Sequence, residues 1–228
     1  GKAGRWCLGD DSSAELGDHG WVSMNKPTKV PIRLFQTQTH ECGYYPERVA
    51  RSLVIDPASP YLAQVYPDAI DHGFRRSSQQ IYRPNCPNCN ACTPSRVVVA
   101  DFVADRSQRR CLARNADLTV TLAPARLNDE YYGLYTRYLN ARHGDGPMAK
   151  SSQQDFDDFL FGQWSHTLFL EVREGDELLA VAVTDLLPQG LSAVYTFYTP
   201  DAPKRGLGTF AILQQIQLAA QRGLPFVY

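Results

Sequence analysis

The chain has 228 residues, of which 43% are hydrophobic and 21% charged, and 23 lysine and arginine residues against 24 aspartate and glutamate residues give a net charge of -1. This composition excludes a disordered chain and provides enough apolar material for one large or two small domains. No stretch approaches the roughly 20 apolar residues of a membrane helix, and the N-terminus lacks the residue order of a secretory signal. We therefore expect a soluble, cytoplasmic protein.

Residues 1–30 contain scattered glycines, balanced charges and no apolar periodicity, which predicts a weakly ordered extension. Beyond it, short apolar runs between turn residues predict strands at 32–35, 53–55, 81–83 and 96–99. A helix is predicted with Ser59 as its cap and Pro60 at its first position. Residues 31–115 are thus predicted to form a small N-terminal domain of mixed α and β structure.

The second half of the sequence is more regular. Apolar residues at helical spacing cover 128–142 and begin again at 155–161. The pattern then predicts strands at 168–172, 178–184 and 191–198, a glycine loop at 205–208, a helix at 209–221 and a strand at 224–228. This order predicts an α+β protein, in which residues 116–228 form a GNAT-like acyltransferase domain with a mostly antiparallel sheet. Because a GNAT sheet normally continues after this strand, we expect the copy to be C-terminally incomplete.

Arginine is concentrated between residues 75 and 114, where eight arginines and two aspartates give a local charge of +6 without any lysine. A planar guanidinium binds phosphate or carboxylate through two parallel hydrogen bonds, which favours positioned recognition of such groups. The alternative is a solvated surface whose arginines pair with acids elsewhere in the chain. Composition favours the two interpretations equally.

Three cysteines, Cys86, Cys89 and Cys92, are separated by two residues each. This spacing brings sulfurs to one centre in a tight turn, as in zinc and iron–sulfur sites. A tetrahedral site needs a fourth ligand, for which Cys42 is the first candidate and His40 the second. The alternative is a set of thiols with no ligand role, and a cytosolic location disfavours disulfides.

Further candidates lie in the second half. The loop from Arg205 to Gly208 offers backbone N–H groups and the positive end of a helix to a phosphate, or is simply a tight turn. The strand that contains Tyr195 and Phe197 alternates between a core face and a cleft face, with core packing as the default. Asp185, at a strand end, is either a proton acceptor or a turn residue.

Taken in chain order, these segments resemble the arginyl-tRNA-protein transferases, in particular the bacterial branch of that family. The resemblance rests on blocks such as His40-Glu41-Cys42-Gly43-Tyr44 and Gly73-Phe74-Arg75-Arg76-Ser77. Further matching blocks lie at 82–96, 107–110, 180–185, 191–198 and 207–213. The sequence departs from the family at Gly206, where serine is usual, and it has Tyr45 where eukaryotic relatives carry a second cysteine.

The resemblance implies a GNAT-like aminoacyl-transfer domain behind the cysteine-containing domain. Its donor would be Leu-tRNA, and its acceptor a protein with an N-terminal Asp or Glu, which leucine would mark for degradation by the N-degron pathway. The alternatives are arginyl transfer to the same acceptors, an acetyl-CoA-dependent GNAT enzyme, and a non-catalytic RNA-binding module.

The resemblance also suggests roles for residues. An aminoacyl ester is already activated, so the enzyme has to orient the acceptor amine, stabilise the oxyanion and help the ribose hydroxyl leave. Tyr195 and Asp185 are the catalytic candidates; the chemistry requires no cofactor, and zinc or iron–sulfur at the cysteines would be structural. For reading the acceptor carboxylate we favour Arg76, then Arg75 and Arg83. The other substrate-binding candidates are Ser107, Gln108, Arg109, Arg110, Phe197, Arg205 and Gly208.

Overall fold

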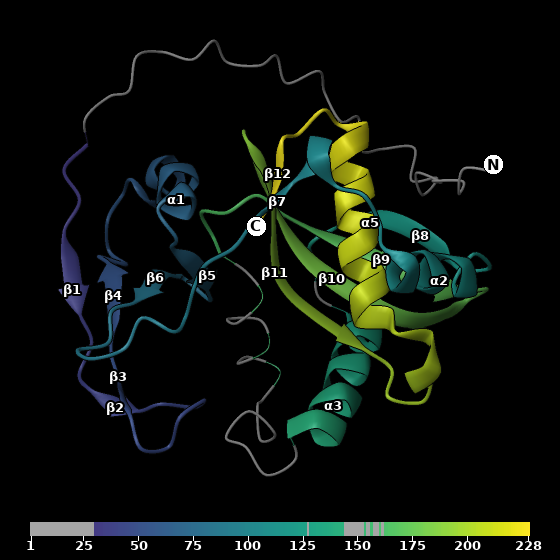
Figure 1. Cartoon of the computed structure of the whole chain (residues 1–228), viewed down its shortest axis with the longest axis horizontal. Coiled ribbons are helices and arrows are strands. Elements are labelled where there is room, and N and C mark those ends of the chain that lie inside the picture. Colours follow the sequence, from purple (N-terminus) through teal and green to yellow (C-terminus); the bar gives the residue numbers. More distant parts are fainter. Residues whose placement is uncertain (1–29, 127, 144–152, 154–155, 157–159, 161) are drawn as a thin grey trace.

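The computed structural model describes residues 30–126, 128–143, 153, 156, 160 and 162–228 (Figure 1). Its N-terminal part is built on an antiparallel four-stranded sheet in the order β1-β4-β6-β5, beside a small hairpin of β2 and β3. The elements of this part are β1 (Leu34–Gln36), β2 (His40–Glu41), β3 (Val49–Ala50), β4 (Ser52–Ile55), α1 (Leu62–Asp71), β5 (Arg75–Ser77) and β6 (Gln80–Pro84).

Helix α1 supplies most of the N-terminal core. Its buried residues, among them Leu62, Val65, Tyr66 and Ile70, recur at helical spacing and pack with Ile81 of β6 and other apolar residues of the sheet. The predicted helix is confirmed, but it begins at Leu62 rather than at Pro60. The hydroxyl of Ser59 accepts a hydrogen bond from the Tyr61 N–H at 3.3 Å, within a turn that precedes the helix.

The C-terminal part is built on a six-stranded sheet in the order β7-β12-β11-β10-β9-β8. All neighbouring strands are antiparallel except β11 and β12, which are parallel over a short stretch. The elements are β7 (Val97–Val98), the 3-10 helix η1 (Val99–Asp101), α2 (Arg106–Arg114), β8 (Thr119–Pro124), α3 (Asp129–His143), β9 (Thr167–Glu174), β10 (Glu177–Leu187), β11 (Gly190–Tyr198), the 3-10 helix η3 (Pro203–Arg205), α5 (Leu207–Gln221) and β12 (Phe226–Val227).

Helices cover both faces of this sheet, with α2 and α5 on one face and α3 on the other (Figure 1). Strand β10 illustrates the arrangement, because Ala180 and Ala182 pack towards α5 whereas Val181 and Val183 pack towards α3. Burial on both faces explains why residues 178–183 of β10 form an unbroken hydrophobic run in the sequence. The predicted α+β class and mostly antiparallel sheet are confirmed, and the strand–loop–helix–strand order is compatible with a GNAT-like domain.

Residues 97–114, which we expected in the N-terminal domain, pack with the C-terminal sheet. Strand β7 pairs with β12, and Cys111 of α2 lies in the core formed with α5. Residues beyond about 96 therefore pack with the C-terminal core. The domain boundary that we predict at residue 115 stays a prediction. Helix α2 was not predicted, because four of its nine residues are arginine and only Cys111 is buried.

The expected N-terminal extension and the helix expected at 155–161 lie outside the described residues, apart from a few positions. Within the part of the chain that is described, no helix is both long and apolar enough to cross a bilayer.

Candidate functional site

The two cores meet at a buried ion pair between Arg76 of β5 and Asp185 of β10. The Arg76 Nε donates to Asp185 Oδ2 at 2.6 Å, and Nη2 donates to Oδ1 at 3.0 Å. Both side chains are 0% exposed. This two-point geometry is the strongest form of the arginine–carboxylate pair. It joins residues 109 positions apart in the sequence.

Neighbouring groups complete the hydrogen bonding of this pair. The Tyr66 hydroxyl donates to Asp185 Oδ2 at 2.8 Å, and the Thr167 hydroxyl donates to Oδ1 at 2.7 Å. Arg76 Nη2 also donates to the Leu160 carbonyl at 3.1 Å. Burial, followed by the Asp185 charge, raises the pKa of Tyr66 far above its ordinary value, so its hydroxyl remains a donor. The charges of Arg76 and Asp185 are thus matched within the protein.

The sequence alone suggests separate roles for Arg76 and Asp185. The structure instead pairs them with each other, which leaves the Arg76 guanidinium without an exposed edge for a ligand. Tyr66 and Thr167 were not anticipated, because a tyrosine on the apolar face of α1 has the same pattern as any core residue. No local signal in the sequence could have revealed a four-residue contact across two sheets.

Beside this pair lies a cavity of about 260 Å³ between the two parts of the molecule. Its walls come from α1 and the β5–β6 hairpin on one side and from β11 and the chain's last residue on the other. The lining residues are Ile70, Phe74, Arg75, Arg76, Tyr82, Pro94, Ser95, Ser192, Ala193, Val194 and Tyr228. Arg83 does not line it. Its Nη1 donates to the His72 carbonyl at 3.2 Å, and its guanidinium lies 5.0 Å from the Phe74 ring centre.

Tyr195 belongs to a group of tyrosines between β11 and α3. The Tyr138 ring lies 6.3 Å from that of Tyr195 and 4.9 Å from that of Tyr198. Arg142 Nη2 donates to the Tyr198 hydroxyl at 3.2 Å. Burial, followed by the neighbouring tyrosines, raises the pKa of Tyr195 well above its ordinary value, so its phenol stays protonated at neutral pH. Phe197 is 0% exposed and packs in the core under α3, so a ligand does not reach it in this structure.

The glycine loop continues from this tyrosine group. A Cβ at Gly208 would lie 3.2 Å from the Tyr198 ring, so the absence of a side chain permits this close approach. Gly206 has φ 66° and ends η3 ahead of α5, a conformation that glycine adopts without strain. Arg205 is paired with Asp117 at 2.9 Å, and it also pairs with Glu174. Its guanidinium is therefore held by acids rather than presented to a phosphate.

Helix α2 carries the rest of the arginine-rich segment. Asp105 and Gln108 close its N-terminus reciprocally, with the side chain of each bonded at 2.8 Å to the backbone N–H of the other. Gln108 is thus engaged in capping, whereas Ser107 is exposed. Arg109 donates to the Ala104 carbonyl at 2.5 Å. Arg106 and Arg110 are exposed and have no ion-pair partner among the described residues.

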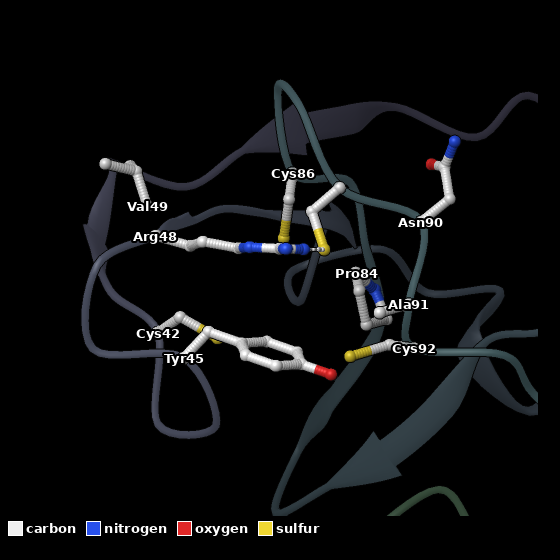
Figure 2. A pocket seen from close by; sticks show the side chains of 10 residues that line it. Cys42, Tyr45, Arg48, Val49, Pro84, Cys86, Asn90, Ala91 and Cys92 are labelled. Carbon is white, nitrogen blue, oxygen red and sulfur yellow. Dashed lines mark hydrogen bonds between the residues drawn. The ribbon is translucent and has the colours of Figure 1, made fainter.

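The four cysteines predicted as ligands, Cys42, Cys86, Cys89 and Cys92, line one pocket of about 100 Å³ (Figure 2). Arg48 extends into it and donates from Nη1 to Cys89 Sγ at 3.2 Å, while its guanidinium lies 4.5 Å from the Tyr45 ring centre. The Ala91 backbone and then Arg48 lower the pKa of the Cys89 thiol. His40 does not line the pocket.

Cys42 and the three spaced cysteines thus line the same pocket, and the metal site stays a prediction. Within the described part of the chain, no three His, Cys, Asp or Glu side chains are close enough together to hold a metal ion. The Arg48 cation bonds to the Cys89 sulfur, where a metal would otherwise carry the positive charge. A metal bound to Cys89 would therefore take the place of the Arg48 guanidinium.

Comparison with known proteins supports one family. The C-terminal model of the arginine-tRNA-protein transferases matches residues 130–228, and the N-terminal model matches residues 40–110. An aspartate/glutamate leucyltransferase of Stenotrophomonas maltophilia strain K279a is 53% identical over 203 residues, which cover 86% of this chain and 81% of the relative. A protein of the same name from Pseudomonas fluorescens strain SBW25 is 50% identical over 197 residues, covering 86% of this chain and 84% of that protein. These matches include the cysteine pocket, the buried ion pair and the tyrosine group. The chain therefore belongs to the arginine-tRNA-protein transferase family.

Proposed function

We propose that this protein transfers leucine from Leu-tRNA to the N-terminal α-amine of proteins that begin with Asp or Glu, in the cytoplasm, and so marks them for degradation. The observation that carries the proposal is the identity of 50–53% to proteins named aspartate/glutamate leucyltransferase, over 86% of the chain. The same names favour leucine over arginine as the transferred residue.

The reaction places limited demands on the protein. The acceptor nitrogen forms an amide bond to the leucyl carbonyl carbon, the ester bond from that carbon to the tRNA ribose oxygen breaks, and a proton leaves the nitrogen as the ribose oxygen gains one. Orientation of the two substrates and stabilisation of the oxyanion provide most of the rate enhancement. The reaction needs no further reactant.

Tyr195 fits the role of a hydrogen-bond donor in this step. Its raised pKa keeps the phenol protonated, so it would donate to the oxyanion or the departing ribose oxygen rather than act as a base. Asp185 accepts hydrogen bonds from Arg76, Tyr66 and Thr167 and is 0% exposed, so we assign it a positioning role instead of proton transfer.

For the tRNA we propose a continuous surface that begins on α2 and ends at the tyrosine group. Helix α2 packs on α5, Cys111 of α2 contacts the Gly206 carbonyl at 3.6 Å, and Gly208 lies against Tyr198. Exposed arginines on α2 would bind backbone phosphates, and the tyrosines would stack against the terminal adenosine.

The test is the transfer of radiolabelled amino acid from charged tRNA to peptides that begin with Asp, Glu or Ala, with Leu-tRNA and Arg-tRNA in parallel. We expect label to move from Leu-tRNA to the Asp and Glu peptides alone. Label from Arg-tRNA would establish the arginyl alternative, and no transfer from either donor would contradict both and make acetyl-CoA the next donor to test.

We propose separately that a structural zinc or iron–sulfur centre binds at Cys42, Cys86, Cys89 and Cys92 when Arg48 withdraws. Metal content of the purified protein, measured by elemental analysis, should then be close to stoichiometric and should fall in Cys89→Ser. It should be unaffected in Cys111→Ser, where the thiol lies in the other core. Equal metal content in all three proteins would contradict the proposal.

A further inference from the structure

We infer that the cavity beside the Arg76–Asp185 pair holds the acidic side chain of the acceptor's first residue, and that Arg75 is the cation that reads its carboxylate. This inference rests on the proposed function and deepens it, because it names the residue that sets the choice of acceptor. It also replaces Arg76, our first candidate from sequence, with its neighbour.

The charges around the cavity favour an anionic ligand. Its lining contains two arginines and no acidic residue. The charge of Arg76 is matched by Asp185, whereas Arg75 is exposed and has no ion-pair partner among the residues that the structure describes. The cavity therefore has one cation available for a carboxylate, which a guanidinium binds through two parallel hydrogen bonds.

The register of the β5–β6 hairpin explains why two adjacent arginines differ. Arg75 pairs across the strands with Tyr82, and Arg76 pairs with Ile81. Since successive side chains of a strand point to opposite faces, Arg76 shares its face with the fully buried Ile81, and Arg75 shares the other face with Tyr82. Arg75 and Tyr82 both line the cavity, so this second face forms one of its walls.

The remaining walls suit a short acidic side chain. Phe74 and Val194 provide apolar contact for methylene groups, and Ser95 and Ser192 provide hydroxyls. The volume of about 260 Å³ is several times the ~30 Å³ that a water molecule occupies in the liquid, so it admits both Asp and Glu, which differ by one methylene. A cavity of this size would select the acceptor's first side chain by its charge rather than by its length.

The cavity shares strand β11 with the tyrosine group. The pairing of β10 with β11 shifts between Val183 and Thr184, which leaves Val194 unpaired between Ala193 and Tyr195. Val194 lines the cavity, and Tyr195 follows it directly in the chain. The cavity wall and the residue that we assign to the oxyanion are thus neighbours along β11, and β-bulges are frequent next to active sites.

The experiment measures kcat/KM for leucine transfer to peptides that begin with Asp, Glu and Asn in the full chain and in Arg75→Ala. We expect the variant to lose roughly tenfold to hundredfold in kcat/KM for the Asp and Glu peptides, the effect of removing one charge-assisted contact. The preference for Asp over Asn should fall towards unity, while the KM for Leu-tRNA stays unchanged. Arg75→Lys should restore part of the preference.

Matched controls separate this role from others. Arg222→Ala removes an exposed arginine at the end of α5 and should retain the Asp preference. A thermal unfolding midpoint for Arg75→Ala equal to that of the unmodified chain would show that the loss is not one of folding. An unchanged Asp preference in Arg75→Ala would overturn the inference. A raised KM for Leu-tRNA with the preference intact would overturn it too and assign Arg75 to a tRNA phosphate.

Direct binding distinguishes failure of the inference from failure of the proposed function. Fluorescence anisotropy with a labelled Asp-initiated peptide requires no charged tRNA. If no donor yields product but the peptide binds in an Arg75-dependent manner, the transfer proposal fails and the acidic subsite stands. If transfer occurs and peptide binding is the same in Arg75→Ala, the subsite assignment fails alone.

Discussion

At the scale of single residues, the main result is that neighbouring arginines have opposite environments. Arg76 is fully buried and bonded to a carboxylate, whereas Arg75 is exposed beside a cavity that no Asp or Glu side chain lines. An ion pair without solvent contact gains little net stability compared with apolar residues, because both ions lose their hydration. Each charge nevertheless depends on the other, because removing one partner leaves the other buried without compensation.

Removing the charge of Asp185 tests this role. Asp185→Asn leaves Arg76 buried without a counter-charge, and we expect it to lower the free energy of unfolding by roughly 3–5 kcal/mol. The control is Asp117→Asn, which removes an acid that is 53% exposed and should change the free energy by less than about 1 kcal/mol. Urea unfolding midpoints and slopes measure both.

A second comparison shows whether the effect belongs to the pair. The double variant with Arg76→Met and Asp185→Leu replaces both charges by apolar groups. It should lose less stability than the sum of the losses in Arg76→Met alone and Asp185→Leu alone. The role would be refuted if Asp185→Asn destabilised the protein no more than Asp117→Asn.

At the scale of elements, α2 combines a capped, partly buried helix with an exposed row of arginines. Its N-terminus is closed by Asp105 and Gln108, and Cys111 anchors it against α5. The anchoring keeps Arg106 and Arg110 on a rigid element, with no acid among the described residues to neutralise them. A fixed row of cations of this kind is expected to bind phosphates and release counterions.

The salt dependence of tRNA binding tests this surface. In Arg106→Ala/Arg110→Ala, the plot of log Kobs against log salt concentration should become shallower by roughly 0.7–0.9 for each phosphate that the variant no longer neutralises. Arg222→Ala should leave the slope unchanged, and the KM for the acceptor peptide should not change in either protein. An unaltered slope in the double variant would exclude α2 from the tRNA-binding surface.

At the scale of the whole molecule, a second set of polar contacts joins the two cores. Arg96 donates to Asp71 at 2.8 Å and lies 3.9 Å over the Phe226 ring. The Tyr228 hydroxyl also donates to Asp71, at 2.6 Å, and Gln189 donates to the Pro67 carbonyl at 2.6 Å. Helix α1 is thereby tied to β12 and to the β10–β11 turn, and with the Arg76–Asp185 pair these contacts hold the walls of the cavity in place.

The amino-acid sequence by itself determined the α+β class and most of the long elements. Strands β9, β10 and β11 and helices α3 and α5 follow from apolar periodicity, which depends only on neighbours within a few residues. The spacing of Cys86, Cys89 and Cys92 marked the cysteine pocket, whereas the fold brings Cys42 to it. Short elements such as β5 and the polar helix α2 have too little periodicity to be recognised.

Only the tertiary structure decided what each candidate residue does. The arginine-rich segment divides between the two interpretations that composition left open: Arg76 and Arg96 pair with acids from other elements, whereas Arg75, Arg106 and Arg110 have no such partner among the described residues. Pairing depends on which side chains a fold brings together across long sequence separations, and it cannot be read from a local pattern. For the same reason, the sequence could not show that Arg205 pairs with two acids or that Arg48 bonds to Cys89.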